Sequence, residues 1–130
     1  MNSSCVILLV NKNKILLQLR DEHAPTNPNV WAFFGGGMDA EETPREAIIR
    51  EAQEELSYQL SKPVLFMKRQ QAHPHFKTEY IFYETYNNQP LTLHEGADMG
   101  WFSREELSDL AMNQQHRYIL ELFFEFLSLR

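Results

Sequence analysis

The residues of this chain whose type and spacing are best suited to binding a metal ion are three glutamates, Glu51, Glu54 and Glu55. On a helix, the i, i+3 and i+4 positions put the three carboxylates on one patch of surface. Like charges so close repel one another and cost helix stability unless a positive group lies between them. Hard oxygen ligands of this kind suit Mg²⁺ or Mn²⁺, and magnesium normally keeps positions for substrate phosphates. The patch is therefore predicted to be a metal platform, and the alternative is a solvated, charged helix face.

The residues before the acids predict a helix start that follows a glycine loop. Thr43 can cap the free backbone N–H groups, Pro44 stands where a missing N–H costs nothing, and Glu46 completes a capping box. The loop, residues 35–37, is all glycine, so backbone can approach a ligand closely. No Gly-Lys-Ser/Thr follows the loop, which excludes a P-loop.

The spacing of these residues resembles the signature of the Nudix hydrolase family, G-x5-E-x7-R-E-U-x-E-E-x-G-U. Gly36, Glu42, Arg50 and the three acids are all in register. Two positions depart from the signature: Ala52 is smaller than the usual bulky aliphatic residue, and Ser57 replaces the closing glycine. Upstream, residues 31–36 resemble the W-x-F-P-G-G segment of MutT-type members, with Phe34 in place of proline.

The resemblance implies an α+β fold, a Nudix-like α/β/α sandwich with a central mixed β-sheet, formed by one Nudix hydrolase domain over residues 1–130. It also implies metal-assisted hydrolysis of a pyrophosphate bond, with Mg²⁺ as cofactor and Mn²⁺ as a substitute. The three acids and the backbone carbonyl of Gly35 would hold the ions, with Glu54 also in a catalytic role. Arg50 would orient the acids through an ion pair with Glu42; the alternative is a surface pair with Glu46.

Outside this signature, one acid resembles a catalytic residue of the family. Glu95 begins a segment similar to the loop before the last strand of MutT-type proteins, where a glutamate near the metals helps to activate water. Glu95 or one of the helix acids would take the proton of that water as general base. The alternative for Glu95 is an exposed loop acid.

The substrate-binding candidates are Arg20, Phe33, Phe34, Gly36 and Asn113. Arg20 follows the second predicted strand, where a MutT-type arginine contacts the nucleotide, although an arginine at a strand end is often only solvated. Asn113 stands, after allowing gaps, where that group places a purine-reading asparagine. Phe33 and Phe34 belong to an aromatic set that is core by default, of which one or two members could stack on a base. Gly36 would let backbone approach the phosphates.

A short segment, His73-Pro74-His75, leaves two further options open. The histidines could bind metal from one face of a strand, but without a third ligand nearby, solvent-facing or substrate-side positions are favoured. Pro74 stands roughly where ADP-ribose-specific members carry a proline, and prolines also end strands for ordinary reasons.

Composition agrees with a small enzyme. The 130 residues, 43% of them hydrophobic, suffice for one domain with a core. The net charge of −6 argues against nucleic-acid binding but not against nucleotides, because bound divalent ions reverse the local sign. The single cysteine, Cys5, lies in an apparent buried strand and suits a reducing cytoplasm. The apolar run from Cys5 to Val10 is too short for a signal peptide or a membrane span, so we expect no membrane partner. We expect the chain to be a monomer or a homodimer.

The elements that must position these residues can be read from periodicity. Strands are predicted at residues 4–10, 15–19, 64–72, 80–86 and 100–102, with a short aromatic strand at Trp31. Residues 103–106 would open a helix with a second capping box. The last segment carries an apolar stripe at helical spacing, which indicates sheet cover, with a dimer face as the alternative; it comprises Ile119, Leu122, Phe123, Phe126 and Leu127.

The identity of the substrate stays open between three readings. A purine nucleoside triphosphate, guanine or oxidised guanine first, cleaved to monophosphate and pyrophosphate, is favoured by the MutT-type positions. ADP-ribose or a nucleotide sugar is the alternative within catalysis. A nucleotide-sensing domain without turnover is disfavoured, because such a domain would be expected to lose acids that this chain keeps.

Overall fold

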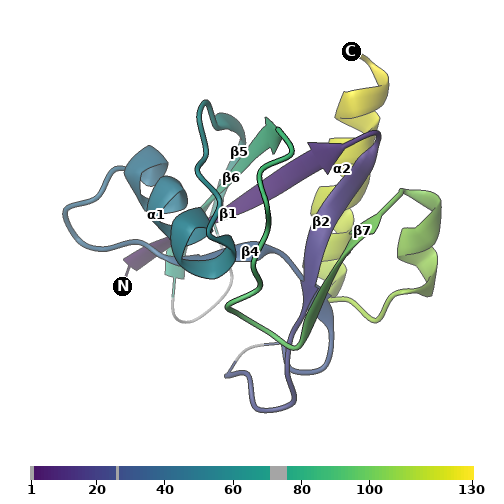
Figure 1. Cartoon of the computed structure of the whole chain (residues 1–130), viewed down its shortest axis with the longest axis horizontal. Coiled ribbons are helices and arrows are strands. Elements are labelled where there is room, and N and C mark those ends of the chain that lie inside the picture. Colours follow the sequence, from purple (N-terminus) through teal and green to yellow (C-terminus); the bar gives the residue numbers. More distant parts are fainter. Residues whose placement is uncertain (1, 26, 71–75) are drawn as a thin grey trace.

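A mixed sheet forms the centre of the molecule in the computed structural model, which describes residues 2–25, 27–70 and 76–130 (Figure 1). Among these residues the sheet has seven strands: β1 (Asn2–Asn11), β2 (Lys14–Leu19), β3 (Trp31–Ala32), β4 (Phe34–Gly37), β5 (Val64–Gln70), β6 (Phe76–Thr85) and β7 (Asp98–Phe102). The main path runs β3-β2-β1-β6-β5, with β4 paired to β1 and β7 to β2. Only the β1–β6 pair is parallel within this described sheet. The predicted central mixed sheet is confirmed.

The two long helices cover opposite faces of this sheet (Figure 1). Helix α1 (Pro44–Leu56) packs on the side chains of one face and α2 (Gln114–Ser128) on those of the other, while a short 3-10 helix, η1 (Glu105–Asp109), precedes α2. Because successive side chains of a strand point to opposite faces, β1 serves both cores. Its alternation sends Cys5, Ile7 and Leu9 towards α1, and Val6 and Leu8 towards α2. The predicted α/β/α sandwich and the buried Cys5 are confirmed.

Strand β2 pairs with β1 over only a short length, which leaves room for β4 beside the rest of β1. The two strands pair only at Val10–Ile15 and Asn11–Lys14, around a tight turn in which Lys12 and Asn13 have φ of 52° and 65°. Further along, β4 takes the place beside β1, and β3 pairs with the far end of β2. Among the described strands, the glycine-containing β4 is therefore paired with β1 alone.

Two predicted elements, the helix opening at residues 103–106 and the strand over residues 64–72, do not match the described structure completely. The capped helix expected at residues 103–106 is only the short η1, and half of its capping box forms: the Ser103 N–H donates to the Glu106 carboxylate at 2.8 Å, while the assigned N-cap, Arg104, makes no side-chain capping bond. Its one buried residue, Leu107, gives no apolar stripe that could extend it. The strand expected over residues 64–72 is described as far as Gln70, since positions 71 and 72 lie outside the described residues.

The terminal stripe of α2 behaves as sheet cover. Of the predicted stripe, Ile119 and Phe123 are buried against β1, β2 and β6, and Phe126 and Leu127 are partly buried in the same core. Leu122 is partly exposed and does not belong to this core, in which Leu120 and Phe124 are buried instead. Neither α1 nor α2 is long and apolar enough to cross a membrane, and the same holds for every helix in the described ranges.

Candidate active site

The start of α1 forms as its sequence indicates. Thr43 Oγ1 accepts the Glu46 N–H at 3.2 Å, and the Glu46 carboxylate accepts the Thr43 N–H at 2.9 Å. Pro44 occupies the first helical turn. Because Glu46 is used in this reciprocal cap, it is not the partner of Arg50, and the alternative surface pair does not form.

Arg50 is the centre of the charged cluster on α1. Its Nε and Nη2 donate to the two carboxylate oxygens of Glu42 at 2.7 and 2.8 Å, a bidentate pair. Its Nη1 donates to Glu51 at 3.1 Å and to Glu54 at 3.0 Å, and Nη2 also reaches the Gly37 carbonyl at 3.2 Å. The Arg50 hydrogen bonds hold the pKa of Glu42 down at about 2. One guanidinium thus joins the loop before α1 to two of the three acids.

Glu51 and Glu55 are buried, whereas Glu54 is exposed. Burial, followed by the charge of Glu51, raises the pKa of Glu55 to about 8, although the N–H of Gly35 donates to its Oε1 at 2.8 Å. Burial also raises the pKa of Glu51, against the lowering effect of Arg50. Burial therefore outweighs the nearby arginines, Arg50 at Glu51 and Arg20 at Glu55, and disfavours the charged form of both buried acids.

The burial of these acids is the observation that tests the predicted metal platform. Within residues 2–25, 27–70 and 76–130, no group of three His, Cys, Asp or Glu side chains is arranged to hold an ion. Glu54 is turned to Arg50 and Glu55 to Gly35. The donor chemistry nevertheless fits a divalent cation, because the oxygen ligands are hard and a cation would favour the charged form of Glu55, whose pKa burial and then the charge of Glu51 raise. The metal role of these acids remains a prediction.

The glycine loop lies against this cluster and has no room for side chains. A Cβ on Gly36 would lie 2.8 Å from Glu51 Oε1. A Cβ on Gly35 would lie 2.1 Å from the Cys5 carbonyl oxygen, and its φ of +149° is unfavourable for other residues. These two glycines are what allow β4 to pass between β1 and the acids of α1.

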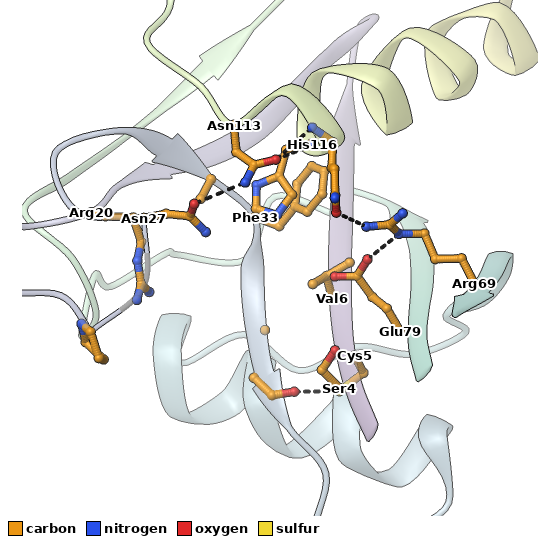
Figure 2. A pocket seen from close by; sticks show the side chains of 15 residues that line it. Ser4, Cys5, Val6, Arg20, Asn27, Phe33, Arg69, Glu79, Asn113 and His116 are labelled. Atoms are coloured by element: carbon orange, nitrogen blue, oxygen red, sulfur yellow. Dashed lines mark hydrogen bonds and ion pairs between the residues drawn. The ribbon is translucent and has the colours of Figure 1, made fainter. Parts of the chain in front are cut away.

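A pocket of about 350 Å³ opens on the other side of β4. Figure 2 shows Asn113, His116 and Phe33 close together, with Arg20 and Asn27 on one side and Arg69 and Glu79 on the other. Gly35 and Gly36 also line the pocket. The volume is in the range of small-molecule sites. The pocket and the acids therefore meet at the same two glycines.

Four of the five predicted substrate residues line this pocket, namely Arg20, Phe33, Gly36 and Asn113. Phe34 is the exception. It is fully buried in the core on the α1 side, because it follows Phe33 in the chain and so points to the opposite face. The structure does not bring Phe34 to the pocket.

Glu95 lies near the acids but does not line the pocket. Its carboxylate is half-exposed and lies 3.8 Å from Arg20 Nη1. Its negative charge contributes to the raised pKa of both Glu51 and Glu55. His73, Pro74 and His75 lie outside the described residues.

Sequence reasoning missed six polar residues of the pocket: Ser4, Asn27, Arg69, Glu79, Gln115 and His116. Arg69 Nε donates to the buried Glu79 carboxylate at 2.9 Å, and the two residues are register partners on β5 and β6. The His116 ring lies 4.5 Å from that of Phe33, and burial, followed by the charge of Arg69, lowers the pKa of His116 to about 4. His116 follows Asn113 by one helical turn, which is the signal that could have found it.

Comparison with known proteins decides the family. The model of the NUDIX domain matches residues 1–123 of this chain. The chain belongs to the Nudix family. The nucleoside triphosphatase NudI of Enterobacter sp. (strain 638) is 32% identical over 126 residues, covering 87% of this Nudix chain and 89% of the relative.

Solved structures agree with this Nudix fold. A MutT structure from work on Aliivibrio salmonicida and Vibrio cholerae superposes with a TM-score of 0.81 at 17% identity, over 95% of this chain and 97% of the other. The NUDIX domain of Shewanella oneidensis NrtR, solved with ADP ribose, has a TM-score of 0.77 at 14% identity, over 98% and 88%. Membership of the family supports a hydrolase that acts on pyrophosphate bonds of small nucleotide substrates.

Proposed function

We propose that this chain is a divalent-metal-dependent pyrophosphohydrolase that cleaves a purine nucleoside triphosphate to a monophosphate and pyrophosphate. The observation that carries the proposal is the position of Gly35 and Gly36 between the pocket and the acids of α1. Both glycines line the pocket, and they lie against Glu55 and Glu51 respectively. A nucleotide bound in the pocket would present its phosphates to the acids of α1. We propose that residues 1–130 form one Nudix domain, which acts in the cytoplasm as a monomer or a homodimer. Its substrates would be small molecules and not nucleic acid.

In this proposal the chain's own residues bind and orient the substrate. Arg20, between the pocket and Glu95, pairs with a phosphate, and Phe33 with His116 offers an apolar face to the base. Glu51, Glu54, Glu55 and the carbonyl of Gly35 would hold Mg²⁺ or Mn²⁺, which when bound neutralises phosphate charge and activates water. Glu95, or a helix acid, accepts the proton of the attacking water.

Recognition of guanine is proposed for the amide of Asn113. The Asn113 carbonyl oxygen already accepts the N–H groups of Gln115 and His116 at 2.7 and 3.2 Å, as the N-cap of α2. Only the amide nitrogen, which donates to Asn27 Oδ1 at 3.2 Å, can turn to a ligand. An amide donor suits the O6 or N7 acceptor of guanine, or the extra oxygen of an oxidised guanine.

A panel of substrates tests the proposed function. Purine and pyrimidine triphosphates, an oxidised guanine triphosphate, ADP-ribose and a nucleotide sugar are offered with Mg²⁺, and released phosphate, pyrophosphate and AMP are measured. We expect guanine triphosphates to have the highest kcat/KM and to yield pyrophosphate. ADP-ribose turnover exceeding every triphosphate by about a hundredfold would replace the substrate proposal by its alternative.

The variant Asn113→Ser is expected to raise KM for guanine nucleotides by roughly tenfold, the loss of one hydrogen bond of about 1.4 kcal/mol. Serine keeps a good N-cap, so the melting temperature should change little. Asn113→Ala is the matched comparison: it should raise KM equally and also melt lower, because the cap contributes about 1 kcal/mol. An equal rise of KM for all bases would show that Asn113 does not read guanine.

The variant Glu95→Gln separates the roles of the acids. If Glu95 is a general base and not a primary ligand, kcat falls while the affinity for Mn²⁺, titrated by its paramagnetic signal, stays near wild type. A large loss of Mn²⁺ binding would reassign Glu95 as a ligand, and unchanged turnover would leave it an ordinary loop acid.

A further inference from the structure

The segment that carries Glu95 is attached to the end of the acid-bearing helix. The N–H of Thr92 donates to the Leu56 carbonyl and the N–H of His94 donates to the Glu55 carbonyl, both at 2.9 Å. The last carbonyls of a helix have no partner within the helix and must find one elsewhere. Here the segment before β7 supplies two of those partners, so its position follows that of α1.

A side-chain contact made by Ser57 adds to these two backbone bonds. Ser57 Oγ and His94 Nε2 lie 2.8 Å apart in a hydrogen bond whose donor depends on the imidazole tautomer. Ser57 is the C-cap of α1, with φ of 52°, a left-handed conformation that glycine adopts without cost. Glycine is also what the family signature carries at this position. Serine at this position therefore adopts a backbone conformation that glycine would adopt more easily, and its hydroxyl contacts His94, next to Glu95.

The other end of the segment is held by β2. The N–H of Ala97 donates to the Leu19 carbonyl at 2.8 Å. Gly96, with φ of +82°, packs so closely that a Cβ would lie 2.7 Å from Gln18 Oε1. Gln18 is itself buried and held by the Phe33 carbonyl, to which its Nε2 donates at 2.8 Å. Glu95 thus lies between a fixed point on β2 and an attachment to α1.

We propose that Ser57 and His94 are positioning residues that hold Glu95 against the acids of α1. The inference rests on the proposed function, in which Glu95 acts on the attacking water. The β2 attachment alone fixes only the C-terminal side of Glu95. On its N-terminal side the Ser57–His94 bond adds a side-chain contact to the backbone bonds of Thr92 and His94. This contact comes from the helix that carries Glu51 and Glu55, so that the acids and Glu95 move as one unit.

Ser57→Gly tests this directly, because it removes the hydroxyl and the strain together. We expect kcat to fall by roughly tenfold to a hundredfold, as for a displaced catalytic group, while KM and Mn²⁺ affinity stay near wild type. The melting temperature should not fall, which separates positioning from stability. Asn13→Gly is the matched control, since it relieves a left-handed residue in the β1–β2 turn and should leave kcat unchanged.

A double-mutant cycle completes the test. His94→Ala should lower kcat as Ser57→Gly does, and the double variant should lose no more than either single variant. Wild-type kcat in Ser57→Gly, or additive losses, would overturn the proposal.

Hydrogen exchange at the His94 amide keeps the inference separate from the proposed function. Exchange should be faster in Ser57→Gly than in wild type, and equal rates would overturn the inference even if the enzyme is active. If wild type hydrolyses nothing in the substrate panel, the proposed function fails, while faster exchange would still support the attachment of the segment.

Discussion

Removal of divalent cations is expected to abolish hydrolysis of every nucleotide, and Mg²⁺ or Mn²⁺ should restore it. Three acids share one helix face, two of them buried where the charged form is disfavoured, and a substrate phosphate would add negative charge beside them. Without a cation, the phosphates and these carboxylates repel one another, and the transition state loses its main electrostatic support. Sustained turnover in excess chelator would contradict the mechanism outright.

Replacing one acid should reproduce most of this loss. Glu55→Gln or Glu54→Gln is expected to lower kcat by on the order of 100-fold or more. The Glu55 variant should remain folded, because the glutamine oxygen can still accept the Gly35 N–H. Without metal it should melt at the same or a higher temperature, since burial disfavours the charged form of Glu55 and glutamine carries no charge. Glu41→Gln, the same charge change at an exposed position before the helix, should leave kcat unchanged.

Arg50→Lys is expected to impair both the fold and the reaction, although it keeps the charge. A lysine cannot reproduce the fork that binds both oxygens of Glu42 while also reaching Glu51 and Glu54. Leaving Glu51 buried with a poorer partner should cost about 2 kcal/mol in the metal-free protein. We expect kcat to fall by roughly tenfold or more, because the loop and the acids lose their common anchor.

Thermal melting with and without Mn²⁺ measures the structural part of this prediction. Added Mn²⁺ should recover part of the lost stability if it binds the folded protein at these acids. Arg45→Lys, on the same helix but exposed, is the control and should change neither melting nor kcat. An Arg50→Lys variant with wild-type melting and kcat would show that the cluster does not depend on the guanidinium.

Local features of the site could be predicted because they depend on residues close in sequence. The capping box of Thr43 and Glu46 needs only a four-residue span, and it forms as expected. The common face of the three acids follows from helix geometry, and the alternation of β1 from strand geometry. The family signature added the Arg50–Glu42 pair, which the structure confirms.

The remaining features depend on contacts between distant segments, which no local pattern encodes. Phe33 and Phe34 are chemically alike in the sequence, and only the orientation of the strand sends one to the pocket and the other to the core. Arg69 and Glu79 become partners only because β5 and β6 pair in one register, and Asn113 meets Asn27 across 86 positions of the chain. The bond from Ser57 to His94 likewise exists only once α1 and the segment before β7 have packed together. The sequence alone determined the chemistry that the acids can perform. The tertiary structure decided the surroundings that those acids share, because burial and pairing between distant elements set charge, access and orientation.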